Sequence, residues 1–525
     1  MNDTGRLKIF TDELHIDESN ILSVLQQAYV THEINRARID YLLKYEAGEQ
    51  TLRREKTVRP EINILNTDNI ANEITDFKRG YFWGNPITLV QRGNKDSGNE
   101  TEQDAIALLN ECYDAEGITA KTQELGRFIE ICGIGYTYVD YKPNYEDGDS
   151  YFQIEVLDPR YAFVVRSNRY VDKRVVLGVS FSQDTNGTRH YTAITDDKRF
   201  EIDELVVFTN TGKVKMKDGK EVRDWKIKTY TQNGEQFIYR NRLGKINIIE
   251  WQRDPDRMGC FERQIPEMDA INIFLSNISN EQEEETECIW HANDVEFEEI
   301  LDEDGKPTGQ YKKPANNDWI TTETTENGKT PFIKPLINSH DYNSQREQVL
   351  SRRALVLQKC NVPQRNDNSG GSTGIAMSDA TGWSSAETDA CKEAMTIAPS
   401  KLEEVDIALR VIKTSELVSS DNPLRALRRN DVKVNMKRSK TYEMTTKINT
   451  YATGVSHGIS PAHMMTTINL FDDPAQVISD SEPYIQMYLE SQYNKGEQTK
   501  DRLEADNSDQ EVNSPMLTGT MSNDY

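Results

Sequence analysis

An amphipathic helix that leads into a block of acidic residues constrains this chain more than any other stretch. Pro266 suits the first turn of a helix, and the acidic residues next to it favour the positive end of the helix. Apolar residues then recur at spacings of three and four, at Met268, Ile271, Leu275 and Ile278. This spacing predicts one narrow packing stripe, with Asn272, Ser276 and Ser279 lying off it.

The acidic block runs from Glu281 to Asp304. It contains twelve acidic residues and no Lys or Arg. A charge run of this kind is commonly a solvated helix end. Whether that interpretation holds here depends on the rest of the chain.

A second helix is predicted at 341–360, and about 50 residues with turns and short β-like runs separate it from the first. Its apolar residues cluster on one side, at Val349, Leu350, Val356, Leu357 and Cys360. A compact insert needs its two ends close together. The two helices are therefore predicted to lie antiparallel, with a small β-rich insert between them.

The chain before this pair mixes helices and strands. Residues 18–46 are predicted to form two helices with a break near Thr31, and Gly48 is placed as the C-terminal cap. The second of these helices has a stripe of Ile34, Ala37, Tyr41 and Tyr45. Short alternating runs from Tyr151 to Glu250, separated by Asp, Asn and Gly turns, predict an antiparallel meander. The fold class is therefore predicted to be α+β with several domains.

The C-terminal part is predicted to be mostly helical. A long helix spans Ser385 to Val418, and Pro399 inside it predicts a kink, because proline removes a backbone hydrogen bond. One strand follows in DVKVNMKR, and then come helices containing 442–451 and 474–492. From Lys495 the chain has seven acids against three bases, which predicts disorder.

Composition excludes several classes of protein. A formal charge of -25 argues against a surface that wraps nucleic acid by neutralising phosphates, although it allows a protein that surrounds nucleic acid without gripping it. The six cysteines lie at intervals of 20 or more, without a CxxC pair, so neither a zinc site nor a disulfide framework is expected. No leader-like or membrane-spanning run is present in the sequence, so no membrane association is expected.

Motifs that could carry chemistry are weak. Gly133-Ile134-Gly135 lacks a third glycine and leads from a helix into a strand, the reverse of a dinucleotide turn. NSGGSTG has no Lys-Ser/Thr pair at P-loop spacing, and His457 and His463 are poorly spaced as metal ligands. We therefore predict no catalytic, cofactor-binding or metal-binding residue.

The order of the parts resembles the portal proteins of tailed bacteriophages. The similarity lies in Tyr41-x3-Tyr45-x2-Gly48, in GYFWGNPI at 80–87, in GIGYTYVDY at 133–141, in the segment from INIIEWQRDPDRMGCFERQIPEMDAINIFLSN onward, and in SGGSTGIAM at 369–377. It covers nearly the whole chain to about residue 490. Its specificity comes from the sequence of elements rather than from any single motif.

The resemblance implies a multidomain portal fold with a helical stem and crown, a mixed α/β wing and a small β-rich clip, assembled as a ring. The corresponding segments are 1–266 for the N-terminal part of the wing, 267–290 for stem helix 1, 291–340 for the clip, 341–360 for stem helix 2, 361–385 for the tunnel loop region, 386–440 for the kinked helix and wing strand, 441–494 for the crown, and 495–525 for an acidic disordered tail.

The resemblance also implies function and partners. Portal rings, usually of twelve subunits, occupy one capsid vertex of the virion; double-stranded DNA is packaged through their channel by the terminase large subunit and later ejected. Other implied partners are further copies of the chain, the major capsid and scaffolding proteins, and a head-completion or adaptor protein that joins the tail. Assembly would occur in the host cytoplasm, and no enzymatic activity or cofactor is implied. The alternative from the residues alone is a soluble enzyme with a domain inserted between two helices.

A channel for DNA must confine it without binding it, since strong contacts with phosphates would slow its passage. The residues predicted to line the channel are Glu281, Glu284, Glu285, Arg346, Arg352, Arg353 and Lys359. The basic ones either form salt bridges to Glu281–Glu287 of a neighbouring subunit or face DNA. The tunnel loop is predicted at Asn368, Ser369, Gly370, Gly371, Ser372, Thr373 and Gly374, and its lack of Lys and Arg puts direct phosphate gripping by that loop in doubt.

Overall fold

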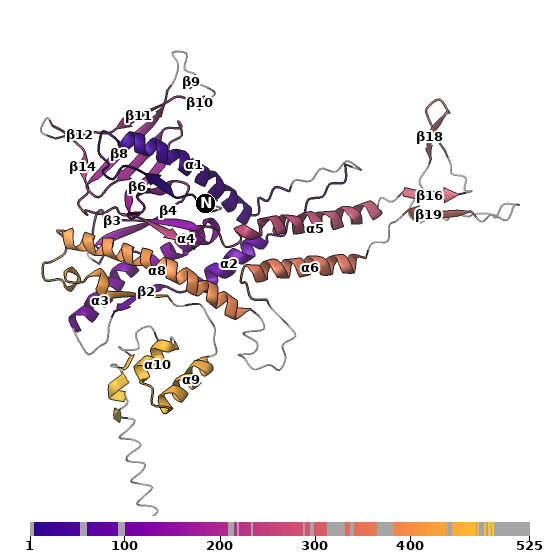
Figure 1. The fold of residues 1–525 in the computed structure, drawn as a ribbon. Coiled ribbons are helices and arrows are strands. Elements are labelled where there is room, and N and C mark those ends of the chain that lie inside the picture. The colour runs from indigo at the N-terminus through magenta and orange to yellow at the C-terminus, as the bar shows by residue number, and fades with distance from the viewer. Residues whose placement is uncertain are drawn as a thin grey trace, which may run out of the picture.

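A computed structural model of the 525-residue chain shows a two-layered body, a helical arm that projects from it, and a small helical unit near the C-terminus (Figure 1). The structure describes residues 5–52, 60–92, 100–146, 148–207, 215–217, 220–232, 235–286, 289–293, 299–311, 331–336, 341–364, 382–436, 438, 444–468, 470–471, 477–478, 481–484 and 486–487. Mixed helices and strands in several sheets confirm the predicted α+β class.

The first layer is an antiparallel sheet covered by one long helix. The sheet runs in chain order through β5 (Ala162–Ser167), β6 (Val175–Gln183), β7 (Arg189–Ile194), β8 (Lys198–Val206) and β11 (Arg223–Ile227). This order confirms the predicted meander for the strands between Ala162 and Ile227, whereas the first and last predicted runs, at 152–157 and 248–252, belong to another sheet. At its ends β1 (Ile9–Thr11) pairs parallel with β5, and β14 (Tyr239–Arg240) pairs with β8.

Helix α1 (Ile21–Glu46) packs its apolar face on this sheet. It is continuous, so the predicted break near Thr31 is wrong. Its predicted stripe is also only partly right, because Ile34 and Tyr41 are 46% and 49% exposed while Tyr45 is buried. Gly48 has φ +96°, which fits its predicted capping position after the helix.

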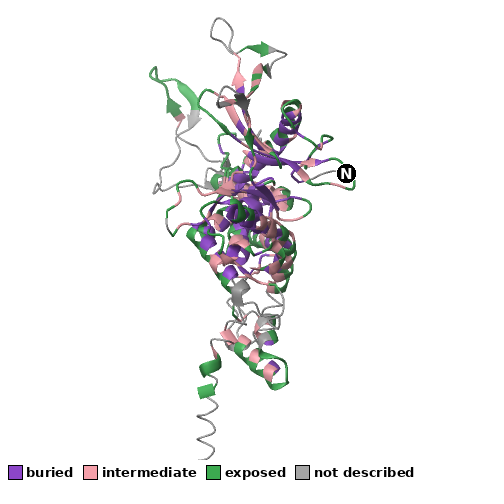
Figure 2. Cartoon of the chain, turned by 90° about the vertical axis from the view of Figure 1, so that its left-hand side faces the viewer, coloured by how far each residue is buried: buried purple, intermediate pink, exposed green. Residues whose placement is uncertain are grey.

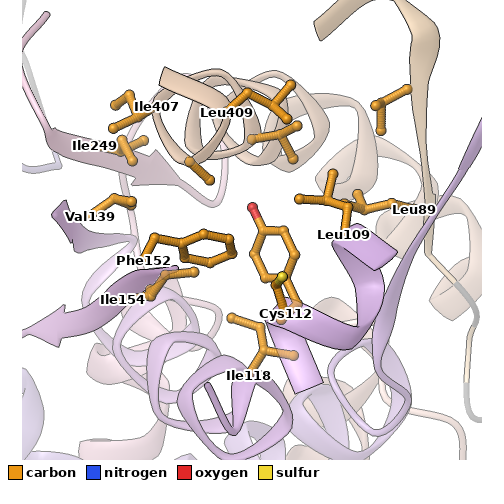
Figure 3. Packing of buried hydrophobic residues seen from close by; sticks show 14 of the residues in the cluster. Leu89, Leu109, Cys112, Ile118, Val139, Phe152, Ile154, Ile249, Ile407 and Leu409 are labelled. Atoms are coloured by element: carbon orange, nitrogen blue, oxygen red, sulfur yellow. The ribbon is translucent and has the colours of Figure 1, made fainter. Parts of the chain in front are cut away.

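The second layer is a three-stranded sheet enclosed by helices. β3 (Ile134–Tyr141) lies between β4 (Phe152–Leu157) and β15 (Ile248–Gln252), and the surrounding helices are α2 (Ile70–Phe82), α3 (Glu100–Ala115), α4 (Ile118–Cys132) and α8 (Trp383–Thr414). Figure 3 shows Val139, Phe152 and Ile249 of the sheet facing Ile407 and Leu409 of α8. Segments more than 250 residues apart therefore share this core.

Gly133 makes the tight passage from α4 into β3 possible. It has φ +75°, and a Cβ at this position would come within 2.6 Å of backbone atoms of Arg257 and Met258. Both the left-handed conformation and the close approach favour glycine. The prediction that this glycine leads from a helix into a strand is confirmed.

Short strand pairs complete the body. β2 (Ile87–Gln91) pairs with β20 (Val432–Met436), which confirms the strand predicted in DVKVNMKR. β9 (Met216–Lys217) pairs with β10 (Lys220–Glu221), and β12 (Tyr230–Gln232) with β13 (Glu235–Phe237). Helix α8 ends at Thr414, four residues before the predicted end, and its helical backbone continues through Pro399.

The arm consists of α5 (Ile265–Thr286) and α6 (Tyr342–Lys359), with a small β unit at its far end (Figure 1). In this unit β16 (Ile289–Asn293) pairs with β19 (Phe332–Leu336), and β17 (Glu299–Leu301) with β18 (Pro307–Tyr311). The predicted first helix, 267–290, was thus too long, since residues 289 and 290 belong to β16. The predicted bounds of the second helix agree with α6.

The C-terminal unit contains α9 (Met444–Ser456) and α10 (Pro461–Thr467). Helix α10 lies between the two predicted helices, 442–451 and 474–492, where no helix was predicted, and Pro461 is well placed to start it. Buried residues gather in the two layers of the body, whereas the C-terminal unit is largely exposed (Figure 2). Within the described part of the chain, no helix has the length and apolar character needed to span a bilayer.

Candidate functional site

The paired helices of the arm form the candidate site, and they run antiparallel as predicted. Gln345, near the start of α6, donates to Glu281 near the end of α5 at 3.1 Å. Arg352, one turn before the last on α6, lies 3.6 Å from Glu267 at the start of α5. Apolar residues join both helices to the body at their common base, namely Met268, Ile271, Val349, Val356 and Leu357.

The packing face of α5 differs from the predicted stripe. Met268 and Ile271 are buried as predicted, but Leu275 and Ile278 are only half-buried. The other buried positions are polar, and they are Asn272, Ser276 and Asn280. Asn272 and Ser276 were predicted to lie off the packing stripe, because apolar spacing alone defines that stripe. The four-residue spacing of 272, 276 and 280 is the signal that could have identified this polar face.

These three polar side chains hold an extended segment, residues 61–69, along α5. The carboxamide of Asn280 accepts from the N–H of Ile64 and donates to its C=O, both at 2.9 Å. Ser276 Oγ accepts from the N–H of Asn66 at 2.9 Å, and Asn272 Oδ1 accepts from the N–H of Asp68 at 2.8 Å. We call this set of contacts the polar ladder.

The polar ladder can form because the repeat of the helix nearly matches the repeat of the extended chain. Four residues of an α-helix rise about 6.0 Å, and two residues of an extended chain advance about 6.6 Å. Side chains four apart on α5 therefore meet alternate backbone groups of the extended segment. The ladder runs antiparallel, since 272, 276 and 280 meet 68, 66 and 64, and it fixes α5 to the part of the chain that precedes α2.

Two of the four basic residues predicted on α6 have acidic partners in their own chain. Arg353 pairs with Asp68 at 2.8 Å and also with Glu73. It thereby links α6 to the end of the ladder and to α2. Arg352 pairs with Glu267, as noted above, while Arg346 and Lys359 are exposed. Contacts of these four residues with DNA or with a neighbouring subunit stay predictions.

Arg353→Glu is expected to lower the free energy of unfolding by roughly 1–2 kcal/mol, because it places a third carboxylate beside Asp68 and Glu73 in a partly exposed site. Arg352→Glu is the matched control. Its single, more exposed contact predicts a change within about 0.5 kcal/mol. Thermal or urea unfolding of both variants measures the difference. Equal unfolding transitions would show that Arg353 does not fasten α6 to the body.

The remaining predicted site residues are three glutamates on α5 and the residues of the predicted tunnel loop. Glu281 lies on α5 and accepts from Gln345. Glu284 and Glu285 belong to the last turn of the same helix, and their side chains lie outside the described residues. Asn368, Ser369, Gly370, Gly371, Ser372, Thr373 and Gly374 also lie outside the described residues. Helix α8 begins at Trp383, inside the predicted tunnel loop region of 361–385.

A buried charge network, which sequence reasoning missed, fastens the first half of α8 to the body. Asp389 of α8 accepts from Lys78 of α2 at 2.6 Å and from Arg253, after β15, at 2.9 Å. Arg253 also donates to Glu130 of α4 at 3.0 Å, and Trp83 donates to the other oxygen of Glu130 at 3.2 Å. Four separate parts of the chain thus meet at one set of charges.

Glu393 adds a third acid to this network, one turn after Asp389. It is 3% exposed, and its carboxyl group faces that of Glu130 without a cation of its own. Burial raises the pKa of Glu393 well above its usual range, and the neighbouring charge of Glu130 raises it further. A protonated Glu393 leaves two acids balanced by Lys78 and Arg253.

The contacts of the arm and the charge network attach helices to the body and place charges. The described residues form no group typical of a reaction centre. Among the described residues, no group of three or more His, Cys, Asp or Glu side chains is placed to hold a metal ion. The described cysteines at 112, 132, 260 and 360 are wholly or largely buried, and burial raises the pKa of each thiol. These thiols are therefore neutral packing groups.

Comparison with known protein families gives a match. The family model described as "Phage portal protein, SPP1 Gp6-like" matches residues 29–490. This range includes the arm, its β unit, α8 and the C-terminal helices. No curated protein matches this chain.

Proposed function

Since the chain belongs to the SPP1 Gp6-like family of phage portal proteins, which are structural components of the DNA-packaging capsid, we propose that it forms the ring-shaped channel at one capsid vertex. The ring would contain twelve copies. Double-stranded DNA would be packaged through its axis and later ejected by the same route. The protein would act without catalysis of its own.

The observation that supports this proposal is the projecting arm with a small β unit inserted at its far end. Copies of this two-helix arm arranged around an axis would form the wall of a tube. In this arrangement α5 and α6 would be the stem, the insert between them that contains β16 to β19 would be the clip, and 441–494 would be the crown. Residues 1–266 and 386–440 would form the wing.

The charges of the arm suit a channel that repels DNA. Glu281, Glu284 and Glu285 would present carboxylates near the exit toward the clip, and this repulsion is strongest at low salt. Arg352 and Arg353 are already paired with acids, which reduces their attraction for phosphates. Residues 368–374, following the stem, would reach into the tunnel.

The partners follow from this position in the capsid. The terminase large subunit would dock on the clip, the major capsid and scaffolding proteins would surround the wing, and a head-completion or adaptor protein would join the tail. The finished ring would be part of the virion after assembly in the host cytoplasm.

Electron microscopy of the purified chain tests the proposal most directly. We expect rings of about twelve subunits with an axial hole wide enough for duplex DNA. A phage that lacks the protein should make empty heads, and the wild-type chain supplied in trans should restore DNA-filled heads. Purified material that contains only monomers or dimers at every concentration and salt tested would contradict a portal ring.

A further inference from the structure

A basic recess lies at the C-terminal end of α8, away from the arm. It has a volume of about 330 Å³ and is lined by Asp406, Leu409, Arg410, Lys413, Arg428, Arg429 and Asn430. Four of these residues are cations and one is an acid. The whole chain has a formal charge of -25, so a cluster with this sign stands out from its surroundings.

The walls of the recess are held in place by the body. Lys413 donates to the backbone oxygen of Leu427 at 2.7 Å, and Arg410 donates to Asp406 at 3.3 Å. Asp406 is shared with Lys245, 3.1 Å away. The single acid of the recess is thus already neutralised, and the cations on its walls keep most of their donors for another group.

The negative end of α8 favours Lys413, which lies in its last turn, but it does not account for Arg428 and Arg429. Arg425 already donates to the backbone oxygens of Lys413, Ser415 and Val418 at 2.8 to 3.0 Å. Within the described part of the chain, Arg428 and Arg429 have no acidic partner at ion-pair distance. Guanidinium groups bind carboxylates in a bidentate manner, so two adjacent ones favour an acidic peptide.

We propose that this basic recess binds the acidic C-terminal segment of the chain, residues 497–511. This segment carries Glu497, Asp501, Glu504, Asp506, Asp509 and Glu511, against Lys500 and Arg502. An extended peptide can enter a recess of this volume, whereas a DNA duplex is too broad and could offer only single phosphates at its rim. Charge and shape therefore both favour the peptide.

The chain that follows the described residues has a long reach. The structure describes the chain as far as Met487, and Asp501 follows 14 residues later. An extended chain of that length spans up to about 46 Å at roughly 3.3 Å per residue. In Figure 1 the C-terminal helices α9 and α10 are drawn below the body, on the side that holds α3 and α8. The segment can belong to the same copy or to a neighbouring one.

Zero-length carbodiimide crosslinking of the full chain, followed by mass spectrometry, tests the proposal. The reagent joins a carboxylate to a lysine in direct contact, and Lys413 is the lysine of the recess. We expect crosslinks from Lys413 to acids of 497–511. Arg428→Glu/Arg429→Glu should reduce their yield at least tenfold, and 0.5 M NaCl should also reduce it, because salt screens such contacts. The control Arg169→Glu/Lys173→Glu makes the same charge change at exposed residues of the turn between β5 and β6 and should leave the yield unchanged.

Mixing ¹⁴N- and ¹⁵N-labelled chains before assembly tells whether the crosslink joins one copy or two, and either result supports the proposal. Crosslinks from Lys413 only to acids outside 497–511 would overturn it. So would protection of Lys413 by a 30-base-pair duplex with no crosslink to the segment, which would assign the recess to DNA. Equal yields in the two double variants would also overturn it. Circular dichroism checks that both variants are folded.

Discussion

Replacing Asn272 and Asn280 together by alanine is expected to detach residues 61–69 from α5. Each change removes a buried carboxamide and leaves backbone groups of Asp68 or Ile64 without their partners. Such a loss costs about 1–3 kcal/mol per site. Amide hydrogen exchange at 64 and 68 should therefore accelerate by roughly thirtyfold or more, because each 1.4 kcal/mol corresponds to about a factor of ten.

Asn277→Ala provides the matched control, because Asn277 is on the same helix but outside the polar ladder. Its exchange rates at 64 and 68 should stay close to those of the wild type. The double variant should also unfold at a lower temperature than the control. If both variants showed the same exchange at these two amides, the ladder would not be what holds the extended segment.

Two other helical asparagines bind extended backbone in the same way as those of the polar ladder. Asn35 of α1 accepts from the N–H of Leu7 at 2.7 Å and donates to its C=O at 2.8 Å. Asn110 of α3 makes the same pair of contacts with Leu89, at 3.2 and 2.9 Å. A carboxamide offers one acceptor and one donor side by side, as a β-strand does. Helical asparagines here bind extended backbone where no neighbouring strand is available.

Buried asparagines of this kind explain why hydrophobic periodicity did not predict every buried helix face. Hydrophobic periodicity identifies a buried face only when apolar residues fill it. On α1 the buried face includes Asn35, and the stripe through Ile34 and Tyr41 lies on the outside. On α6 the predicted Leu350 is 53% exposed, although Val349, Val356 and Leu357 pack as predicted. A surface meant for another subunit can carry such exposed apolar residues.

Local signals were sufficient for much of the fold. The meander follows from alternating strands and turn residues, and the helix–insert–helix order follows from spacing and from the need to close a compact insert. The charge network could not be predicted from the sequence, because its members come from four distant parts of the chain, at Lys78, Glu130, Arg253 and Asp389. Even for Glu130, which lies between the apolar Ile129 and Ile131, nothing in the sequence identifies Arg253 as its partner.

Glu393, in the charge network, should make the stability of the folded chain depend on pH. The pKa of Glu393 is raised in the folded chain above that of an unfolded glutamate, near 4.5. Between these two pKa values the folded state binds one proton more than the unfolded state. The stability that protonated Glu393 contributes is therefore complete below the unfolded pKa and is lost as the pH rises toward the folded pKa. The slope is about 1.4 kcal/mol per pH unit.

Glu393→Gln should remove this slope. Glutamine is neutral at every pH and keeps an N–H donor that can face the carboxylate of Glu130, as the protonated acid does. The variant should be more stable than the wild type at neutral pH, and the gap should widen by up to about 1.4 kcal/mol per unit as the pH rises from 5.5 to 8.5. Urea unfolding followed by circular dichroism across this range measures it.

Glu403→Gln is the control for this measurement, since Glu403 lies on the same helix but pairs with Lys245 at a side-chain exposure of 43%. Its unfolding should follow the wild-type dependence on pH. A Glu393→Gln variant that loses stability at every pH would mean that the carboxylate of Glu393 is ionised and held by Lys78 or Arg253. A gap that widens as predicted would mean instead that α8 is fixed to the body by a proton shared between two glutamates. The attachment of the helix that follows the proposed tunnel loop would then weaken as the pH rises.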